Sequence, residues 1–316
     1  MTSATGRQVV GLLFTAMLLL SVSGTAIAAS MDHATRAHRI TGGKPTQVKT
    51  PTIAKRTPAR RPLPPEGILL KELRTGHVLF EHNADLPMAP ASLTKIMSAL
   101  IILEDGNLDD PVTVSRKAAA AKKIKLYLKP GQVLPLRGLL EAMLIRSAND
   151  ACLAAVEHVG ENEQLFVEKM NAKAAAMGLT HTHFQNACGF DMPGHLSTAD
   201  DLARLTQYAM DHETFAAIVQ EPASVIRTTD QRKRYVARTT NRLIGSMEGA
   251  IGVKTGYTRG AGRCLIAIVR RDDREVLLVM LNARQRWERA HELIESSFRA
   301  AQSLSPASPE TVAASQ

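Results

Sequence analysis

The sequence predicts an α+β fold, with one antiparallel sheet flanked by helices and a helical lobe beside it. Strand-like segments open the body, helical periodicity fills its middle third, and strand-like segments return in its last third. Strands near both ends with helices between them favour a single sheet that holds both ends of the body. The length of 316 residues and the hydrophobic fraction of 45% fit a globular protein with one large domain or two small ones.

The body begins with two strand-like stretches and then a helix. Residues 67–73 and 77–81 flank Arg74-Thr75-Gly76, which has the composition of a hairpin turn. Ser92 then precedes apolar residues at spacings of three and four, which form one stripe on a helix: Leu93, Ile96, Met97, Leu100 and Ile101. We therefore expect a helix that begins near Ser92.

The middle third is predicted to be helical and the last third to return to strands. The expected helices are residues 136–144, 151–159, 164–177 and 201–210. Gly178 suits a helix C-cap, and Thr198 followed by Asp201 is typical of a helix N-terminus. The expected strands are residues 225–229, 235–239, 251–255, 264–269 and 276–281, with a hairpin turn at 272–274 and a closing amphipathic helix at 288–298.

The N-terminal segment has the pattern of a secretory signal peptide. Arg7 precedes an apolar run over residues 9–22, and small residues follow at 26–29. The run is shorter than the roughly 20 apolar residues that span a bilayer, which favours an exported, periplasmic protein over a retained anchor. We place the signal peptide at 1–28 and leave its cleavage site open.

Basic residues gather in the segment that follows the signal. Residues 1–65 hold nine Lys and Arg against one acidic residue, whereas residues 66–316 hold 30 and 29. Nucleic-acid binding by the body is therefore not expected, although the net charge is +9. We expect a flexible, basic, Pro-rich linker at 29–65, a folded domain at 66–301 and a flexible tail at 302–316. A solvated linker is the main interpretation, and attraction of the linker to anionic cell-wall polymers or lipid headgroups is the alternative hypothesis.

The three cysteines leave at least one without an intrachain partner. Cys152, Cys188 and Cys264 fit neither zinc spacing nor a C-x-x-C redox motif. Cys264 lies in an apolar run and is expected to be a buried small hydrophobe. One disulfide is possible, and the sequence does not say which. No spacing of His, Asp or Glu indicates a metal, and no cofactor is expected.

The first chemical motif is Ser92-Leu93-Thr94-Lys95. A serine hydroxyl is a poor nucleophile without a nearby base. Residues three apart on a helix share a face, so Lys95 is placed to remove the Ser92 proton. Burial and a second cation such as Lys254 would favour the neutral amine that this role needs. Alone, the motif is weak, because an N-cap serine and a solvated lysine give the same pattern.

Two further motifs follow in order. Ser147-Ala148-Asn149 lies between two expected helices, where the serine could relay a proton and the amide bind substrate; a plain capping turn is the alternative.

Lys254-Thr255-Gly256 ends an expected strand and offers a cation, a hydroxyl and a close backbone approach for an anionic substrate end. The backbone N–H groups of Tyr257 and Ser92 could together form an oxyanion hole. The ordered set of three motifs indicates an acyl-transfer serine enzyme, since S-x-x-K, a Ser/Asn element and K-T-G together are the signature of penicillin-binding proteins and class A β-lactamases.

With these motifs the sequence resembles the low-molecular-mass penicillin-binding proteins, the serine D-alanyl-D-alanine carboxypeptidases and their DD-endopeptidase relatives. The resemblance runs from about residue 66 to 298 and includes residues 89–97, 127–131, 147–151, 177–179, 183–184, 195–199 and 252–262. It implies a β-lactamase/DD-peptidase-like fold. It also implies hydrolysis of peptidoglycan stem peptides through an acyl-enzyme, with β-lactams as inhibitors.

The resemblance also implies roles for individual residues. Ser92 would be the nucleophile and Lys95 its base. Ser147 and Asn149 would form the second catalytic element, and the third would bind substrate through Lys254, Thr255, Gly256 and Tyr257. Arg286 would correspond to a family arginine that helps hold the substrate's terminal carboxylate; a solvated cation at a helix start is the alternative. His195 suggests a triad, but no G-x-S-x-G elbow accompanies it, so a structural hydrogen-bonding role is expected.

The sequence leaves open the preferred target and two alternative functions. No basic amphipathic helix follows the catalytic domain, which resembles the anchorless endopeptidase branch, so no stable membrane anchor is expected. The target is a terminal D-alanine, a D-Ala–meso-diaminopimelate cross-link, or both. A β-lactamase is less well supported, because no E-x-x-x-N element precedes the K-T-G strand. A catalytically silent wall-binding protein is opposed by the intact Ser92, Lys95 and Lys254.

Overall fold

The computed structural model describes residues 65–122 and 124–302, without the side chains of the last two. These residues belong to one compact unit, 61–316. The expected signal peptide at 1–28, nearly all of the linker at 29–65 and the tail from 303 onward lie outside the described residues. No helix in the described part is long and apolar enough to cross a membrane.

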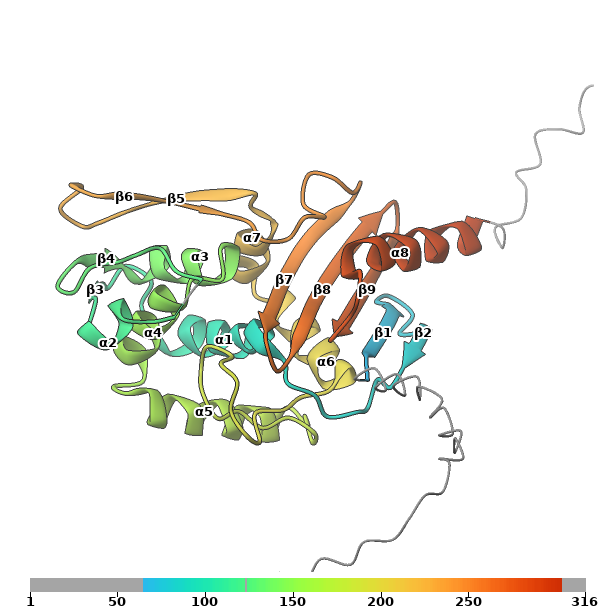
Figure 1. The fold of residues 1–316 in the computed structure, drawn as a ribbon. Coiled ribbons are helices and arrows are strands. Elements are labelled where there is room, and N and C mark those ends of the chain that lie inside the picture. Colours follow the sequence, from blue (N-terminus) through green and yellow to red (C-terminus); the bar gives the residue numbers. More distant parts are fainter. Residues whose placement is uncertain (1–64, 123, 303–316) are drawn as a thin grey trace, which may run out of the picture. The chain divides into compact units, whose positions relative to one another are not determined.

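The centre of the fold is a five-stranded antiparallel sheet in the order β2-β1-β9-β8-β7. Its strands are β1 (Gly67–Glu72), β2 (Val78–His82), β7 (Ala250–Thr258), β8 (Gly262–Arg271) and β9 (Arg274–Leu281). Strand β1 pairs with both β2 and β9, so the first strand of the body lies beside the last. The prediction that one sheet holds both ends of the body is confirmed (Figure 1).

Each face of the sheet contributes to a different hydrophobic core. Successive side chains of a strand point to opposite faces, and β8 divides accordingly: Ile266 and Ile268 join one core, and Leu265 and Ala267 the other. The second core is completed by Ala290, Ile294 and Phe298 of α8 (Arg286–Gln302). The amphipathic helix expected at 288–298 therefore covers one face of the sheet (Figure 1).

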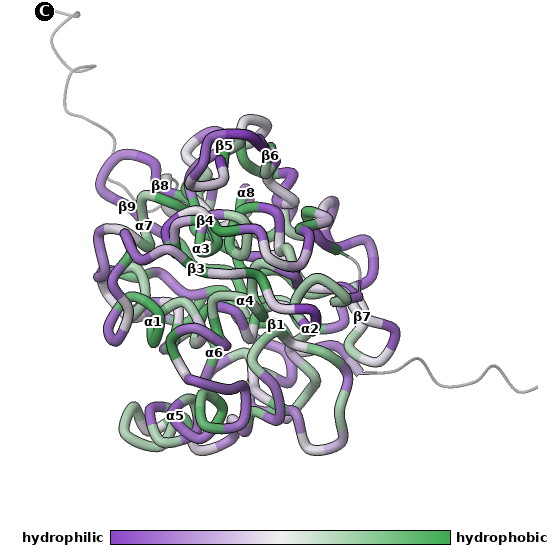
Figure 2. Tube along the Cα trace, turned by 90° about the vertical axis from the view of Figure 1, so that its left-hand side faces the viewer, coloured by the Kyte–Doolittle hydropathy of each residue, from purple (hydrophilic) through white to green (hydrophobic). Residues whose placement is uncertain are grey.

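The other face packs against the helical lobe. Its helices are α1 (Lys95–Asp105), α2 (Arg116–Ala119), α3 (Leu136–Ile145), α4 (Asn149–Val159), α5 (Glu163–Ala176), α6 (Ala199–Met210) and α7 (Glu213–Gln220). In Figure 2 hydrophobic stretches run through the inside of this lobe, and hydrophilic stretches lie at its periphery. Two predicted helix ends are confirmed. Thr198 Oγ1 accepts a hydrogen bond from the Asp201 N–H, and Gly178 has a φ of 68° just after the last turn of α5.

Two expectations about the strands and the first helix were wrong in part. The strands at 225–229 and 235–239 form β5 (Ala223–Arg227) and β6 (Arg234–Arg238), but as a separate hairpin outside the sheet. Each has one fully buried residue, too few for a strand inside a packed sheet, and the hairpin rests on α3 instead. The helix expected to begin near Ser92 begins at Lys95, after the 3-10 turn η1 (Ala91–Thr94).

Several short elements carry too little periodicity to be predicted from sequence. These are α2, α7 and the two-stranded pair of β3 (Pro111–Thr113) and β4 (Val133–Pro135). The three or four residues of α2, β3 and β4 cannot display a periodic pattern, and the eight residues of α7 cover only about two helical turns, so neighbouring structure decides their conformation.

Candidate active site

Ser92 is the one partly exposed residue in a buried segment. Ala91 has a φ of 49°, a conformation that costs free energy for a residue with a Cβ, and the η1 turn follows it. Leu93 and Ile96 are fully buried and anchor the turn in the core. This arrangement presents the Ser92 hydroxyl to a cleft of about 620 Å³.

Lys95 is fully buried, and its side-chain nitrogen is surrounded by oxygen atoms. Its Nζ atom lies 3.0 Å from Ser92 Oγ and 2.8 Å from Asn149 Oδ1, and it also contacts the backbone carbonyl of Cys188. Burial, with a smaller contribution from the charge of Lys254, holds the pKa of Lys95 well below its usual range. A buried lysine with a lowered pKa next to a serine hydroxyl is a suitable general base.

The second motif lies where expected, between α3 and α4. Ser147 is buried, with a φ of 63°, and Asn149 is the first residue of α4. The Asn149 side chain is already engaged within the protein: Oδ1 accepts from Lys95, and Nδ2 donates to the Lys122 carbonyl at 3.1 Å. In this structure Asn149 therefore orients Lys95, whereas a substrate contact had been expected. Ser147 lines the cleft.

The third motif also borders the cleft, through Thr255, Gly256 and Tyr257. Lys254 is buried, donates to the Thr255 carbonyl at 3.2 Å, and has its pKa lowered to about 7 by burial and then by the charge of Arg286. Thr255 Oγ1 lies 2.5 Å from Thr240 Oγ1. Tyr257 is 65% exposed at the rim.

Gly256 allows β7 to approach the nucleophile closely. A Cβ atom at this position would lie 3.0 Å from Ala91 Cβ and 3.1 Å from the backbone nitrogen of Ser92. A side chain here would push the strand away from η1, so the glycine keeps the backbones of the first and third motifs in contact.

Arg286 is brought to the cleft from the first turn of α8. Its Nη1 donates to the carbonyls of Gly256 and Cys264, both at 2.9 Å, and its guanidinium stacks on Trp287 at 4.5 Å. Burial lowers its pKa, and its buried Nε has no hydrogen-bond partner among the described residues. Arg286 is half-buried and lines the cleft, so it is not a fully solvated cation at the helix start.

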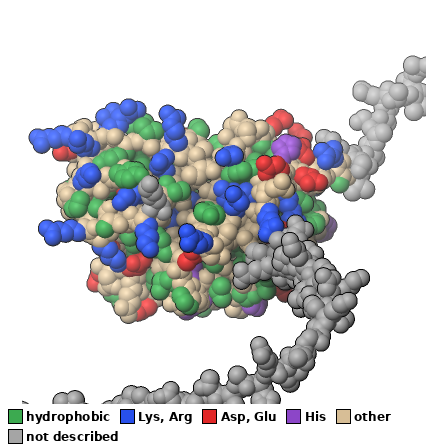
Figure 3. Space-filling view, in the orientation of Figure 1, with side chains coloured by type: hydrophobic (Ala, Val, Ile, Leu, Met, Phe, Trp, Pro, Cys, Tyr) green, Lys and Arg blue, Asp and Glu red, His purple; other side chains and the backbone are tan. Residues whose placement is uncertain are grey.

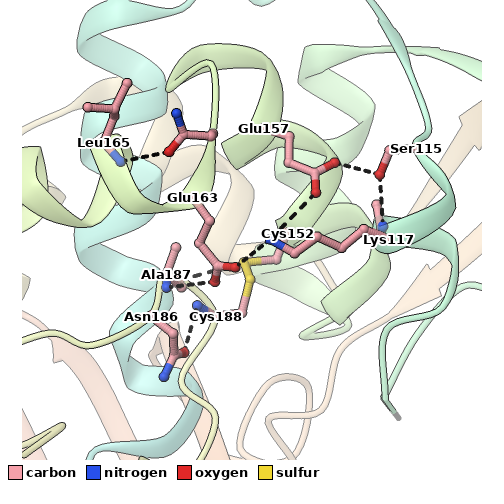
Figure 4. Close-up of polar contacts among 11 residues, drawn as sticks. Ser115, Lys117, Cys152, Glu157, Glu163, Leu165, Asn186, Ala187 and Cys188 are labelled. Atoms are coloured by element: carbon pink, nitrogen blue, oxygen red, sulfur yellow. Dashed lines mark hydrogen bonds and ion pairs between the residues drawn. A yellow bond between two sulfur atoms is a disulfide. The ribbon is translucent and has the colours of Figure 1, made fainter. Parts of the chain in front are cut away.

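A disulfide secures the loop that carries the Cys188 carbonyl. Cys152, on α4, is bonded to Cys188 (Figure 4). Cys264 is buried with a free thiol. Asn186 Oδ1 accepts from the N–H groups of residues 188, 189 and 190, and Glu163 accepts from the Ala187 N–H at 3.4 Å. The link therefore joins the two elements, α4 and this loop, that supply the acceptors of Lys95.

His195 has a structural position, as expected. Its Nδ1 accepts from the Gln185 N–H at 2.9 Å, and its Nε2 lies 2.8 Å from Thr94 Oγ1, which itself donates to the Ala91 carbonyl. These roles require a neutral ring with the proton on Nε2. Burial, assisted by His183, lowers the pKa of His195 to about 4, which favours that neutral form.

The sequence analysis did not single out several residues at this site. Thr240 and Arg242 follow β6 and line the cleft, together with Phe190 from the disulfide loop. Asp191 joins that loop to the end of β7, accepting from Thr258 Oγ1 at 2.5 Å and from the Gly260 N–H at 3.0 Å. Thr240 and Arg242 adjoin an unremarkable strand, so only the path of the hairpin reveals their position.

Known proteins resemble this chain over the part that contains these residues. Residues 57–285 match the family described as D-alanyl-D-alanine carboxypeptidase. The chain is 34% identical to the D-alanyl-D-alanine carboxypeptidase DacF of Bacillus subtilis, over 71% of this chain and 59% of the relative. It is also 34% identical to DacC of Escherichia coli, over 78% of this chain and 64% of the relative. The chain thus spans about three fifths of the length of these two relatives.

Solved structures show the same likeness in three dimensions. A variant of a Streptomyces DD-transpeptidase superposes with a TM-score of 0.70 at 28% identity, covering 74% of this chain and 97% of that one. Penicillin-binding protein D2 from Listeria monocytogenes, in its ampicillin-bound form, gives 0.65 at 29% identity, covering 73% and 96%.

Proposed function

The chain belongs to the D-alanyl-D-alanine carboxypeptidase family, and from this membership we propose that it is a serine DD-peptidase acting on peptidoglycan stem peptides. The proposed reaction is hydrolysis of the peptide bond after a D-alanine residue, either at the terminal D-alanine or at a D-Ala–meso-diaminopimelate cross-link. The acyl group is carried on Ser92.

The surroundings of Lys95 carry this proposal. A neutral amine has two N–H donors and one lone pair, and two of the three neighbours of Nζ are oxygens that only accept: Asn149 Oδ1 and the Cys188 carbonyl. With both N–H groups so directed, the lone pair faces the third neighbour, Ser92 Oγ at 3.0 Å. The hydroxyl then donates its hydrogen bond to the amine, which is the geometry that a general base needs.

The acylation step follows from this geometry. Lys95 takes the Ser92 proton as Oγ bonds to the carbonyl carbon, and the N–H groups of Ser92 and Tyr257 stabilise the oxyanion. When the carbon–nitrogen bond breaks, the leaving amine receives the proton from Lys95, directly or through Ser147. Water then attacks the ester, Ser92 regains its proton, and the shortened peptide leaves.

The cations of the third motif and of the first turn of α8 suit an anionic substrate end. Arg286 and the Thr255 hydroxyl line the cleft, and Lys254 is buried next to Thr255 in the chain; we assign all three to the carboxylate of the residue that leaves. The buried Nε–H of Arg286 lacks an acceptor among the described residues and is available for this purpose.

We further propose that the chain is exported and matures outside the cytoplasm. The sequence pattern of residues 1–28 supports export. The disulfide between Cys152 and Cys188 also supports it, because such bonds persist mainly in oxidising compartments.

Muropeptide digestion tests the proposal. The purified protein is incubated with pentapeptide monomers and cross-linked dimers, with Ser92→Ala as control, and the products are read by mass spectrometry. We expect loss of one D-alanine from monomers, conversion of dimers to monomers, or both, and no reaction with Ser92→Ala. A wild type that leaves both substrates intact would contradict the proposal.

Labelling with a β-lactam separates the remaining alternatives. We expect ampicillin to add covalently to Ser92 in the wild type and not in Ser92→Ala. Rapid release of hydrolysed ampicillin would point to a β-lactamase. Stable labelling without muropeptide turnover would point to a catalytically silent wall-binding protein.

A further inference from the structure

Positive charge is concentrated in two segments of the folded part. Residues 116–146 hold eight Lys and Arg and one acidic residue, and residues 227–242 hold six and one. The rest of residues 66–316 holds 16 basic and 27 acidic residues. The nearly neutral total therefore conceals a basic region and an acidic remainder. We call the surface formed by the described residues of these two segments the basic face.

The two segments lie side by side. The Thr229 N–H donates to the Val133 carbonyl at 2.9 Å, and Tyr235 Oη donates to Gln132 Oε1 at 2.6 Å. The hairpin of β5 and β6 lies over α3 and beside β4 (Figure 1), and blue side chains gather over this part of the molecule in Figure 3. The basic face is thus one surface, although about 80 residues separate its two segments.

The outer side of the hairpin carries arginines that are not neutralised. Arg227 is the direct cross-strand neighbour of Arg234, and both are exposed, as is Arg238. Like charges directly opposite each other destabilise a strand pair. Among the described residues none of these three arginines has an ion pair, whereas Lys117, in the other segment, is paired with Glu163 at 2.9 Å.

The exposed arginines lead towards the active-site cleft. Arg234 and Arg238 are outward positions of β6, and the chain then supplies Thr240 and Arg242 to the wall of the cleft. At about 3.3 Å per residue, Arg234 and Thr240 are roughly 20 Å apart along this path. This distance is longer than the part of a substrate that lies directly around one scissile peptide bond. It is comparable to a stretch of polymer.

We propose that the basic face binds the carboxylate-bearing polymer whose peptide end occupies the cleft. This rests on the proposed function and names a second contact for the same substrate. Neighbouring stem peptides of one strand present carboxylates, which guanidinium groups bind in bidentate fashion. Attachment to one strand makes the second contact intramolecular and raises the effective concentration of peptide at Ser92.

The first test measures binding without hydrolysis. Ser92→Ala is sedimented with purified peptidoglycan at low and high salt, alone and combined with Arg227→Gln/Arg234→Gln. Arg74→Gln/Arg299→Gln is the matched control, since it removes the same charge from exposed sites outside the basic face. We expect the hairpin variant to bind about tenfold more weakly at low salt, the control to bind normally, and the difference to shrink at high salt.

The second test compares substrates in the protein with an intact Ser92. For Arg227→Gln/Arg234→Gln we expect kcat/KM to fall about tenfold on peptidoglycan and to stay unchanged on a short D-Ala-D-Ala peptide. A melting temperature at or above that of the wild type would show that the fold is intact.

Each opposite result overturns the proposal. Equal binding by the hairpin variant and the control, or equal loss on both substrates, contradicts it. Binding to vesicles of anionic phospholipid that needs these arginines, with no effect on peptidoglycan binding, would assign the face to a membrane. Because the sedimentation test does not require catalysis, failure of the proposed hydrolysis would be recognised separately.

Discussion

Lys95 Nζ lies 2.8 Å from Asn149 Oδ1, so the residue in the position of a catalytic base is oriented by the first residue of a different helix. Asn149 is itself held by its Nδ2 contact with the Lys122 carbonyl, which fixes the direction of the amide. An amide oxygen accepts a hydrogen bond without carrying a full negative charge. It can therefore hold the amine without strongly favouring the protonated form.

Asn149→Asp places a negative charge where the amide oxygen now lies. That charge favours protonated lysine, so the pKa of Lys95 rises and less neutral base is present at a given pH. We expect the acidic limb of the pH profile for acylation by a β-lactam to move up by about one unit or more. Asn107→Asp, an exposed change of equal charge, should leave the profile in place. An unmoved limb in Asn149→Asp would argue against Lys95 as the base.

Lys254 contributes to the pKa of Lys95 through its charge. Removing that charge in Lys254→Met raises the pKa of Lys95, so the acidic limb of acylation moves to higher pH. The effect should be largest below about pH 7, where Lys254 is itself protonated. Lys254→Arg keeps the charge and should keep the position of the limb. The measurement is the single-turnover acylation rate against pH, scaled to its plateau.

Reduction of the disulfide should weaken both the fold and the site. The bond closes a loop with a sequence separation of 36, for which chain entropy predicts a loss of about 4 kcal/mol in the free energy of unfolding. With the loop less restrained, water reaches Lys95 and the acylation rate falls. The double variant Cys152→Ser/Cys188→Ser should have the free energy of unfolding and the acylation rate of the reduced wild type, and neither should change when reductant is added. A Cys264→Ala variant should respond to reductant as the wild type does, since Cys264 is outside the bond.

His195 should make stability depend on pH. Its pKa is about 4 in the folded protein and 6.5 as the ordinary value, so the unfolded chain binds more protons between those limits. Stability is therefore full above about pH 6.5 and falls as the pH drops towards 4, by about 3 kcal/mol for this group. Urea unfolding of His195→Gln should show a smaller slope over this range than the wild type and than His77→Gln, an exposed control. Identical slopes in all three would refute the assignment.

Regular elements and the three motifs were predictable, because both rest on local patterns. The periodicity of residues 136–144 located α3 to within one residue of its end, and the ordered motifs anticipated that Ser92, Lys95, Asn149 and Lys254 would meet. Their meeting depends on the fold, but the spacing and order of the motifs are properties of the sequence alone.

The unpredicted features depend on contacts between distant segments. The acceptor that Cys188 offers to Lys95 is a backbone carbonyl, a group that every residue has, so no residue type marks it. The pairing of Cys152 with Cys188 and the detached position of the hairpin were equally invisible, since each is decided by packing across the lobe.

The free thiol of Cys264 bears on how the chain matures. Three cysteines allow three different single disulfides, and only one of them joins α4 to the loop beside Lys95. Cys264 is buried in β8, and burial raises the pKa of its thiol to about 11, so little of the reactive thiolate is present once the sheet has formed. We therefore expect correct oxidation to depend on the order of events. A chain whose sheet forms before oxidation can form only the bond between Cys152 and Cys188, whereas a chain oxidised earlier can form any of the three bonds.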